Sequence, residues 1–147
     1  MSPPIVVSRH ISAPPSAVYS YLTESTRWAR WQGIDASIEP RPGGEFVMTM
    51  PDGATARGEF VELVPDRRVV FTWGWVDHPS VPPGSSTVEV QIVEEVGGSL
   101  VTLTHRDLPD DEISVHASGW NHYLPRLAAV AEGREVPLDA VPPDQGD

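Results

Sequence analysis

The residues of this chain best suited to chemistry are two histidines and a tyrosine, His105, His116 and Tyr123. An imidazole can exchange a proton near neutral pH, and a phenol can donate a hydrogen bond to a carbonyl or hydroxyl group. The three could therefore position or protonate a bound molecule, provided that each reaches it and has an orienting partner. The simpler alternative, which we favour, is that each histidine is buried and bonded to a backbone carbonyl, or marks the first turns of a helix.

A long amphipathic helix must position two of these residues. Four residues follow one another at spacings of four, three and four, and so share one side of a helix: His116, Trp120, Tyr123 and Leu127. His122 lies six residues after His116, roughly 240° around the helix. The two histidines therefore cannot bind one metal ion from this helix.

The same helix is predicted over about residues 111–132, ending at Gly133. We expect a bend near Pro125, because proline lacks the backbone N–H. Gly119 lies in the middle, where glycine costs roughly 1 kcal/mol relative to alanine. Its place beside Trp120 indicates either close packing of the helix on a sheet or a space left open for a ligand.

Alternating apolar residues predict a first strand over residues 5–11 and, after residue 42, a run of five antiparallel strands. One of these covers residues 68–76. Two short helical segments are predicted between the first strand and the run, over about residues 15–23 and around Trp28 and Trp31. This order predicts an α+β fold in which a curved antiparallel sheet covers the apolar side of the C-terminal helix.

The inward positions of these elements would form an aromatic and thioether lining that suits a flat or flexible apolar molecule. The candidate ligand-binding residues are Trp28, Trp31, Met48, Met50, Phe60, Phe71, Trp73, Trp75, Leu103, His105, His116, Trp120, Tyr123 and Leu127. For the two methionines we favour ordinary core packing, because an inward stripe in any half-buried sheet looks the same. For Trp28 and Trp31 we favour packing of the short helix over the sheet. Trp73 and Trp75 present a larger aromatic surface on one face of the strand than a compact core of this size needs. They could form either the wall of a cavity or part of a solid core, and the sequence favours neither interpretation.

Composition excludes several classes of function. The formal charge is −11, from 10 Lys+Arg against 21 Asp+Glu, and the basic residues are scattered, which argues against a nucleic-acid partner. There is no cysteine, hence no disulfide or thiol nucleophile, and we expect neither a metal nor a cofactor. The sequence has no long apolar run that would predict a membrane span. It also has no N-terminus in which basic residues precede an apolar stretch, the pattern of a secretory signal. We therefore expect a cytoplasmic protein. We expect a single domain over residues 1–133, followed by a mobile tail over 134–147, rich in proline and acidic residues and without chemistry of its own.

A set of motifs covers most of the chain. They are Ile11-Ser12-Ala13-Pro14, Trp28-x-x-Trp31, Pro42-Gly43-Gly44-x-Phe46, Gly58-x-Phe60-x-Glu62-x-x-Pro65, Phe71-Thr72-Trp73 and His116-x-x-Gly119-Trp120-x-x-x-Leu124-x-x-Leu127. In order and spacing the chain resembles the START-like (SRPBCC) superfamily, and within it the branch similar to the Hsp-ninety ATPase activator C-terminal domain. This resemblance implies a helix-grip fold with an apolar cavity between sheet and helix. Pro125 departs from the family pattern.

Members of this superfamily differ in function: they include lipid carriers, polyketide cyclases and a co-chaperone domain. The fold therefore does not settle the function. Our first hypothesis is binding of a small hydrophobic molecule, lipid or polyketide-like, in the cavity. The alternatives are a cyclase or aromatase-like enzyme in which His105, His116 or Tyr123 moves protons, although no complete catalytic motif is visible, and a co-chaperone-like regulator of an ATPase. A homodimer through a sheet edge or an exposed helix is compatible with all three.

Overall fold

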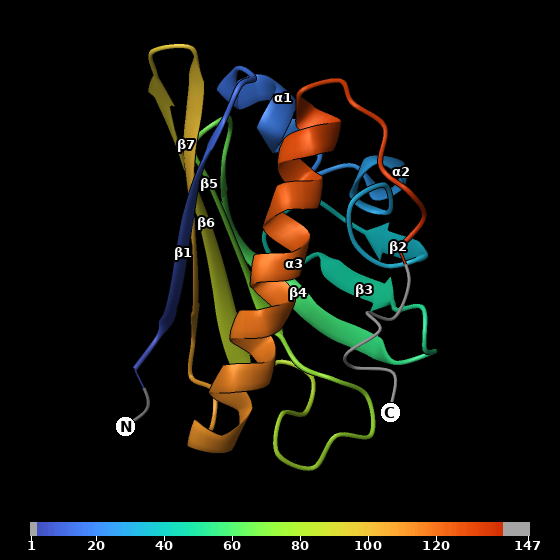
Figure 1. Ribbon diagram of the computed structural model, residues 1–147. Helices are drawn as coiled ribbons and strands as arrows, with labels where there is room; N and C mark the ends of the chain where they lie inside the picture. Colours follow the sequence, from blue (N-terminus) through green and yellow to red (C-terminus); the bar gives the residue numbers. More distant parts are fainter. Residues whose placement is uncertain (1–2, 140–147) are drawn as a thin grey trace.

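A seven-stranded antiparallel sheet curves around one long helix (Figure 1). This computed structural model describes residues 3–139. Its elements are β1 (Ile5–Ile11), α1 (Pro15–Ser20), α2 (Ser25–Trp28), β2 (Asp35–Ile38), β3 (Glu45–Thr49), β4 (Thr55–Val64), β5 (Arg68–Trp73), β6 (Ser86–Glu95), β7 (Gly98–Arg106), the short 3₁₀ helix η1 (Asp110–Glu112) and α3 (Ile113–Ala131). The α+β fold and the curved antiparallel sheet predicted from the sequence are confirmed.

The strand order is β1-β7-β6-β5-β4-β3-β2, so the first strand pairs with the last. Consecutive strands from β2 to β7 are neighbours, which is the order expected of a meander. The β2 strand was not predicted. It has only four residues, two of them polar, and as an edge strand it pairs only with β3, so its alternation is too short to recognise.

The β5 strand ends at Trp73, three residues earlier than predicted. A Cβ on Gly74 would lie 1.8 Å from the carbonyl oxygen of Pro82, so the backbones of the β5–β6 loop meet here at glycine contact distance. Trp75 then forms a single bridge with Ala56 of β4, and its amide donates to the Val81 carbonyl at 2.7 Å. The predicted strand therefore becomes the start of a loop that folds back over the sheet end.

The end of the sheet near α1 and α2 is filled by a dense aromatic core. The Trp28 ring lies 5.1 Å from both Trp31 and Phe46, and Phe46 stacks on Phe71 at 4.7 Å. The indole nitrogens of both tryptophans are satisfied, by the Gln32 side chain and by the Tyr21 carbonyl, each at 3.0 Å. Trp28 and Trp31 therefore pack the short helical segment over the sheet, as the favoured interpretation predicts.

The α3 helix is continuous through Pro125, and a bend at that residue stays a prediction. Residues 134–139, the first part of the predicted tail, lie against the domain. Arg126 donates to the Pro137 carbonyl at 2.8 Å, and the Asp139 carboxylate accepts a 2.7 Å bond from the Gly33 amide. The rest of the predicted tail lies outside the described residues.

We predict that Gly74→Ala destabilises the fold by about 1–3 kcal/mol, the usual cost of overpacking a close contact. The new methyl group would press against backbone atoms of Pro82 and Pro83, which cannot rotate away. Chemical denaturation measures the change. The matched control is Gly119→Ala, because a Cβ there meets no heavy atom within 4 Å. Equal stability of Gly74→Ala and the wild type would contradict the close approach.

Candidate functional site

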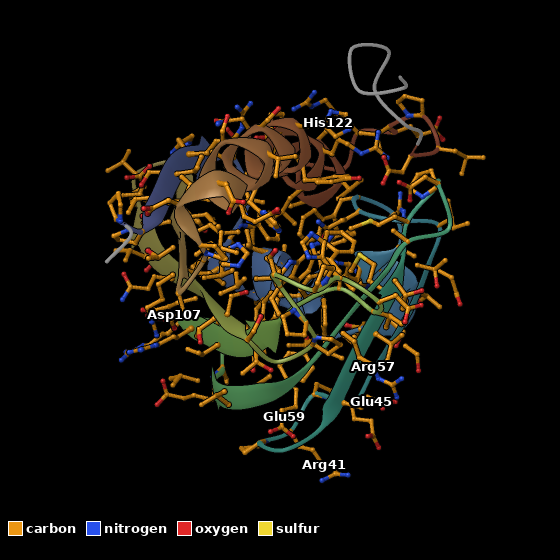
Figure 2. The ribbon with its side chains drawn as sticks, turned by 90° about the horizontal axis from the view of Figure 1, so that it is seen from below. Arg41, Glu45, Arg57, Glu59, Asp107 and His122 are labelled. Atoms are coloured by element: carbon orange, nitrogen blue, oxygen red, sulfur yellow. The ribbon has the colours of Figure 1, made fainter. Side chains whose placement is uncertain are left out.

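A pocket of about 470 Å³ opens at the end of the molecule where α3 begins. Its walls come from the first turns of α3, from the turn between β3 and β4, and from the end of β5 with the loop that follows it (Figure 1). The residues that line it are Gln32, Met50, Pro51, Asp52, Ala54, Trp73, Trp75, Val76, Asp77, His78, Pro79, Glu112, Val115, His116, Gly119, Trp120 and Tyr123. Figure 2 views the molecule from this end, with α3 lying across the curved sheet.

Gly119 explains part of this opening. A Cβ built on it has no heavy atom within 4 Å, and the residue lines the pocket. Of the two reasons considered for a glycine in mid-helix, close packing and open space, the structure confirms open space.

His105 lies at the centre of a buried hydrogen-bond chain that joins α3 to the sheet. Trp120 of α3 donates its indole N–H to Nδ1 of His105 at 2.9 Å. Nδ1 is thus the acceptor, so Nε2 carries the proton and donates to Ser86 Oγ at 2.9 Å, while Ser86 donates to the Trp73 carbonyl at 2.7 Å. With His105 in the neutral form, both of its ring nitrogens and the Ser86 hydroxyl have a hydrogen-bond partner.

His116, one helical turn before Trp120 on α3, is also held by an indole N–H. Trp75 donates its indole N–H to His116 Nε2 at 3.0 Å, so Nδ1 carries the proton and donates to the Glu112 carbonyl at 2.8 Å. The two imidazole rings are 5.3 Å apart and perpendicular. Two indole–imidazole pairs therefore lie side by side between α3 and the sheet.

Burial keeps both rings uncharged. It lowers the pKa of His105 from 6.5 to about 3, and the neighbouring His116 acts in the same direction. Burial also lowers the pKa of His116, against the opposing effect of Glu112. Because all four ring nitrogens are occupied by protein groups, neither histidine offers a free atom to a substrate. The favoured interpretation is confirmed for His116, which bonds a backbone carbonyl in the first turns of α3. His105 is buried as expected, but its partners are the side chains of Trp120 and Ser86 and not a backbone carbonyl.

Tyr123 faces the pocket one turn after Trp120. Its hydroxyl donates to the Asp139 carboxylate at 2.8 Å, and the same carboxylate oxygen accepts from the Gly33 amide. Burial and this carboxylate raise the pKa of Tyr123, so the phenol stays protonated. The hydroxyl proton of Tyr123 is therefore used in the hydrogen bond to Asp139, in the segment that follows α3.

The structure divides the predicted ligand-binding residues into two groups. Those that line the pocket are Met50, Trp73, Trp75, His116, Trp120 and Tyr123. Those that do not line it are Trp28, Trp31, Met48, Phe60, Phe71, Leu103, His105 and Leu127, which are buried. The inward side of a strand looks the same in sequence whether it meets a ring or a space, so alternation could not separate them.

Three acidic pocket residues, Asp52, Asp77 and Glu112, were not among the predicted site residues. Their sequence context carries no functional signal, because Pro51-Asp52-Gly53 is typical of a turn and Glu112 suits the start of a helix. A further feature appears only in the structure: the buried Nε1 of Trp73 has no hydrogen-bond partner among the described residues.

Within residues 3–139, no group of three or more His, Asp or Glu side chains is arranged to hold a metal ion. No helix of the described chain is long and apolar enough to cross a membrane.

A curved antiparallel sheet that grips a long C-terminal helix defines a START-like protein. The chain belongs to the activator of Hsp90 ATPase homolog 1-like family, whose profile matches residues 12–132. The human activator of 90 kDa heat shock protein ATPase homolog 1 is 27% identical over 110 residues, which are 74% of this chain and 31% of that protein. The match thus spans less than a third of the length of this curated relative.

Solved structures share the whole fold. An AHSA1-like protein from Rhizobium etli is 42% identical, with a TM-score of 0.70 over 92% of this chain and 86% of that one. A protein from Chromobacterium violaceum is 25% identical, with a TM-score of 0.77 over 90% and 99% of the two chains. The family and fold expected from the sequence motifs are confirmed.

The neutral state of His105 predicts a pH dependence of stability. Its pKa is lower in the folded protein, about 3, than the ordinary 6.5 of an unfolded chain, so between these values the unfolded state binds more protons. Stability therefore falls as the pH decreases from 6.5 towards 3, with a contribution of about 1.4 kcal/mol per pH unit. We expect a shallower slope in His105→Gln, measured by chemical denaturation at a series of pH values. An unchanged slope would contradict the assignment.

Proposed function

We propose that this chain binds a small, largely apolar molecule in the pocket between α3 and the sheet. The observation that carries the proposal is the space beside Gly119, next to three indole side chains, in a helix where alanine would be more stable. A volume of about 470 Å³ lies within the usual range of small-molecule sites.

The arrangement of polar groups supports binding over proton transfer. A cyclase-like reaction would need an imidazole or phenol with a free atom near the substrate. His105 and His116 have both ring nitrogens engaged, and Tyr123 donates to Asp139. We therefore place the cyclase-like alternative behind simple binding.

Family membership favours a second candidate function, the regulation of an Hsp90-type ATPase. We expect that, if this holds, adding the chain to purified Hsp90 changes the rate of ATP hydrolysis, measured with a coupled assay. A chain unfolded by heating serves as the control. An unchanged rate at saturating concentration would contradict this candidate without affecting the first.

Three further expectations stay predictions. They are the cytoplasmic location, a homodimer through a sheet edge or helix, and a single domain that ends near residue 133.

We predict that Gly119→Leu weakens ligand binding at least about tenfold, because the new side chain occupies the pocket. Gly119→Ala should bind nearly as the wild type does, since it adds one methyl group. Fluorescence titration with the neutral probe N-phenyl-1-naphthylamine measures the affinity.

Both variants should be at least as stable as the wild type, because alanine and leucine favour a helix by about 0.5–1 kcal/mol over glycine. A loss of binding therefore cannot be ascribed to unfolding. Wild-type affinity in Gly119→Leu would place the probe outside this pocket.

A further inference from the structure

All the formally charged residues that line the pocket, histidines aside, are acidic. Asp52 comes from the β3–β4 turn, Asp77 from the β5–β6 loop and Glu112 from η1, so three separate segments bring carboxylates to one opening. No arginine or lysine lines the pocket within the described chain. A pocket with this lining attracts cations and repels anions.

The three carboxylates differ in their hydrogen bonds and ion pairs. The Asp52 side chain accepts the Ala54 amide at 2.9 Å, and its charge acts on Tyr123. Glu112 lies 3.6 Å from both His78 Nε2 and His116 Nδ1. Asp77 has a positive φ of 65° and forms no ion pair with any described residue. Its negative charge is therefore not neutralised within the described part of the chain.

The inner wall of the pocket is aromatic. Trp73 lies 5.3 Å from Trp75 and 5.4 Å from Trp120, ring centre to ring centre. The electropositive N–H edges of Trp75 and Trp120 are directed at His116 and His105. An indole is neutral overall, but the quadrupole of its ring makes the ring face electronegative, and a cation is attracted to that face. Trp73 is 2% exposed, and its buried Nε1 has no hydrogen-bond partner among the described residues.

We propose that the pocket selects an organic ammonium ion with an apolar or aromatic body. The indoles would hold the apolar body and the methylated or protonated nitrogen, and the carboxylates of Asp52, Asp77 and Glu112 would supply the opposite charge at the opening. This inference rests on the proposed function, because it requires a small molecule in the same pocket.

Three probes of one shape test the charge preference. They are (naphthalen-1-ylmethyl)trimethylammonium, its neutral carbon isostere 1-neopentylnaphthalene, and the anion naphthalen-1-ylmethanesulfonate. Quenching of tryptophan fluorescence measures each affinity. We expect the cation to bind about tenfold more tightly than the isostere, with the anion weakest, and the cation's advantage to shrink as salt is added.

The variants Asp52→Asn and Asp77→Asn should each weaken cation binding severalfold and reduce the advantage of the cation over the neutral isostere. Asp66→Asn is the matched control, because Asp66 is also exposed and has a positive φ of 63°, but lies at the opposite end of β5, before that strand begins. Asparagine tolerates this backbone conformation, so the variants differ from the wild type mainly in charge.

Equal affinity for cation and isostere, or a preference for the anion, would overturn the inference and leave the proposed function standing. An equal effect of Asp66→Asn and Asp77→Asn would overturn it too, because general charge would then be the cause. If none of the three probes binds the wild type, the proposed function falls as well. Melting temperatures of all variants confirm that each one is folded.

Discussion

Two indole–imidazole hydrogen bonds connect α3 to the sheet, and the site depends on them. Trp120 donates to His105 of β7, while Trp75, just beyond β5, donates to His116 of α3. Each bond crosses between helix and sheet, so together they fix how α3 is rotated on the concave face. The Trp120–His105 bond is buried, so breaking it would leave a buried donor and a buried acceptor unsatisfied, which is costly.

The same bonds shape the pocket and limit its chemistry. They hold two indoles in place as pocket walls, and they occupy the histidine nitrogens that proton transfer would need. A wall with fixed aromatic rings requires little reorganisation when a ligand enters, which favours binding. The arrangement therefore combines a rigid aromatic wall with an absence of free acid–base groups on these two histidines.

The aromatic residues of this chain serve two different purposes at the two ends of the sheet. Near α1 and α2, Trp28, Phe46 and Phe71 pack ring against ring and leave no opening. Near the start of α3, Gly119 withholds a side chain and the β5–β6 loop turns away at Gly74, so the rings there border a space. Family membership accounts for the shared fold.

The sequence by itself determined the α+β class, the family, the long helix and the apolar side of that helix, because periodicity and motif spacing are local properties of the chain. It also identified Gly119 as a residue that needed an explanation, and placed six of the pocket residues in its candidate set. Only the tertiary structure decided which aromatic residues border a space, since a strand's inward side reads the same over a void and over a ring. The histidine partners and the meeting of Asp52, Asp77 and Glu112 likewise depend on segments far apart in the chain, which only folding brings together.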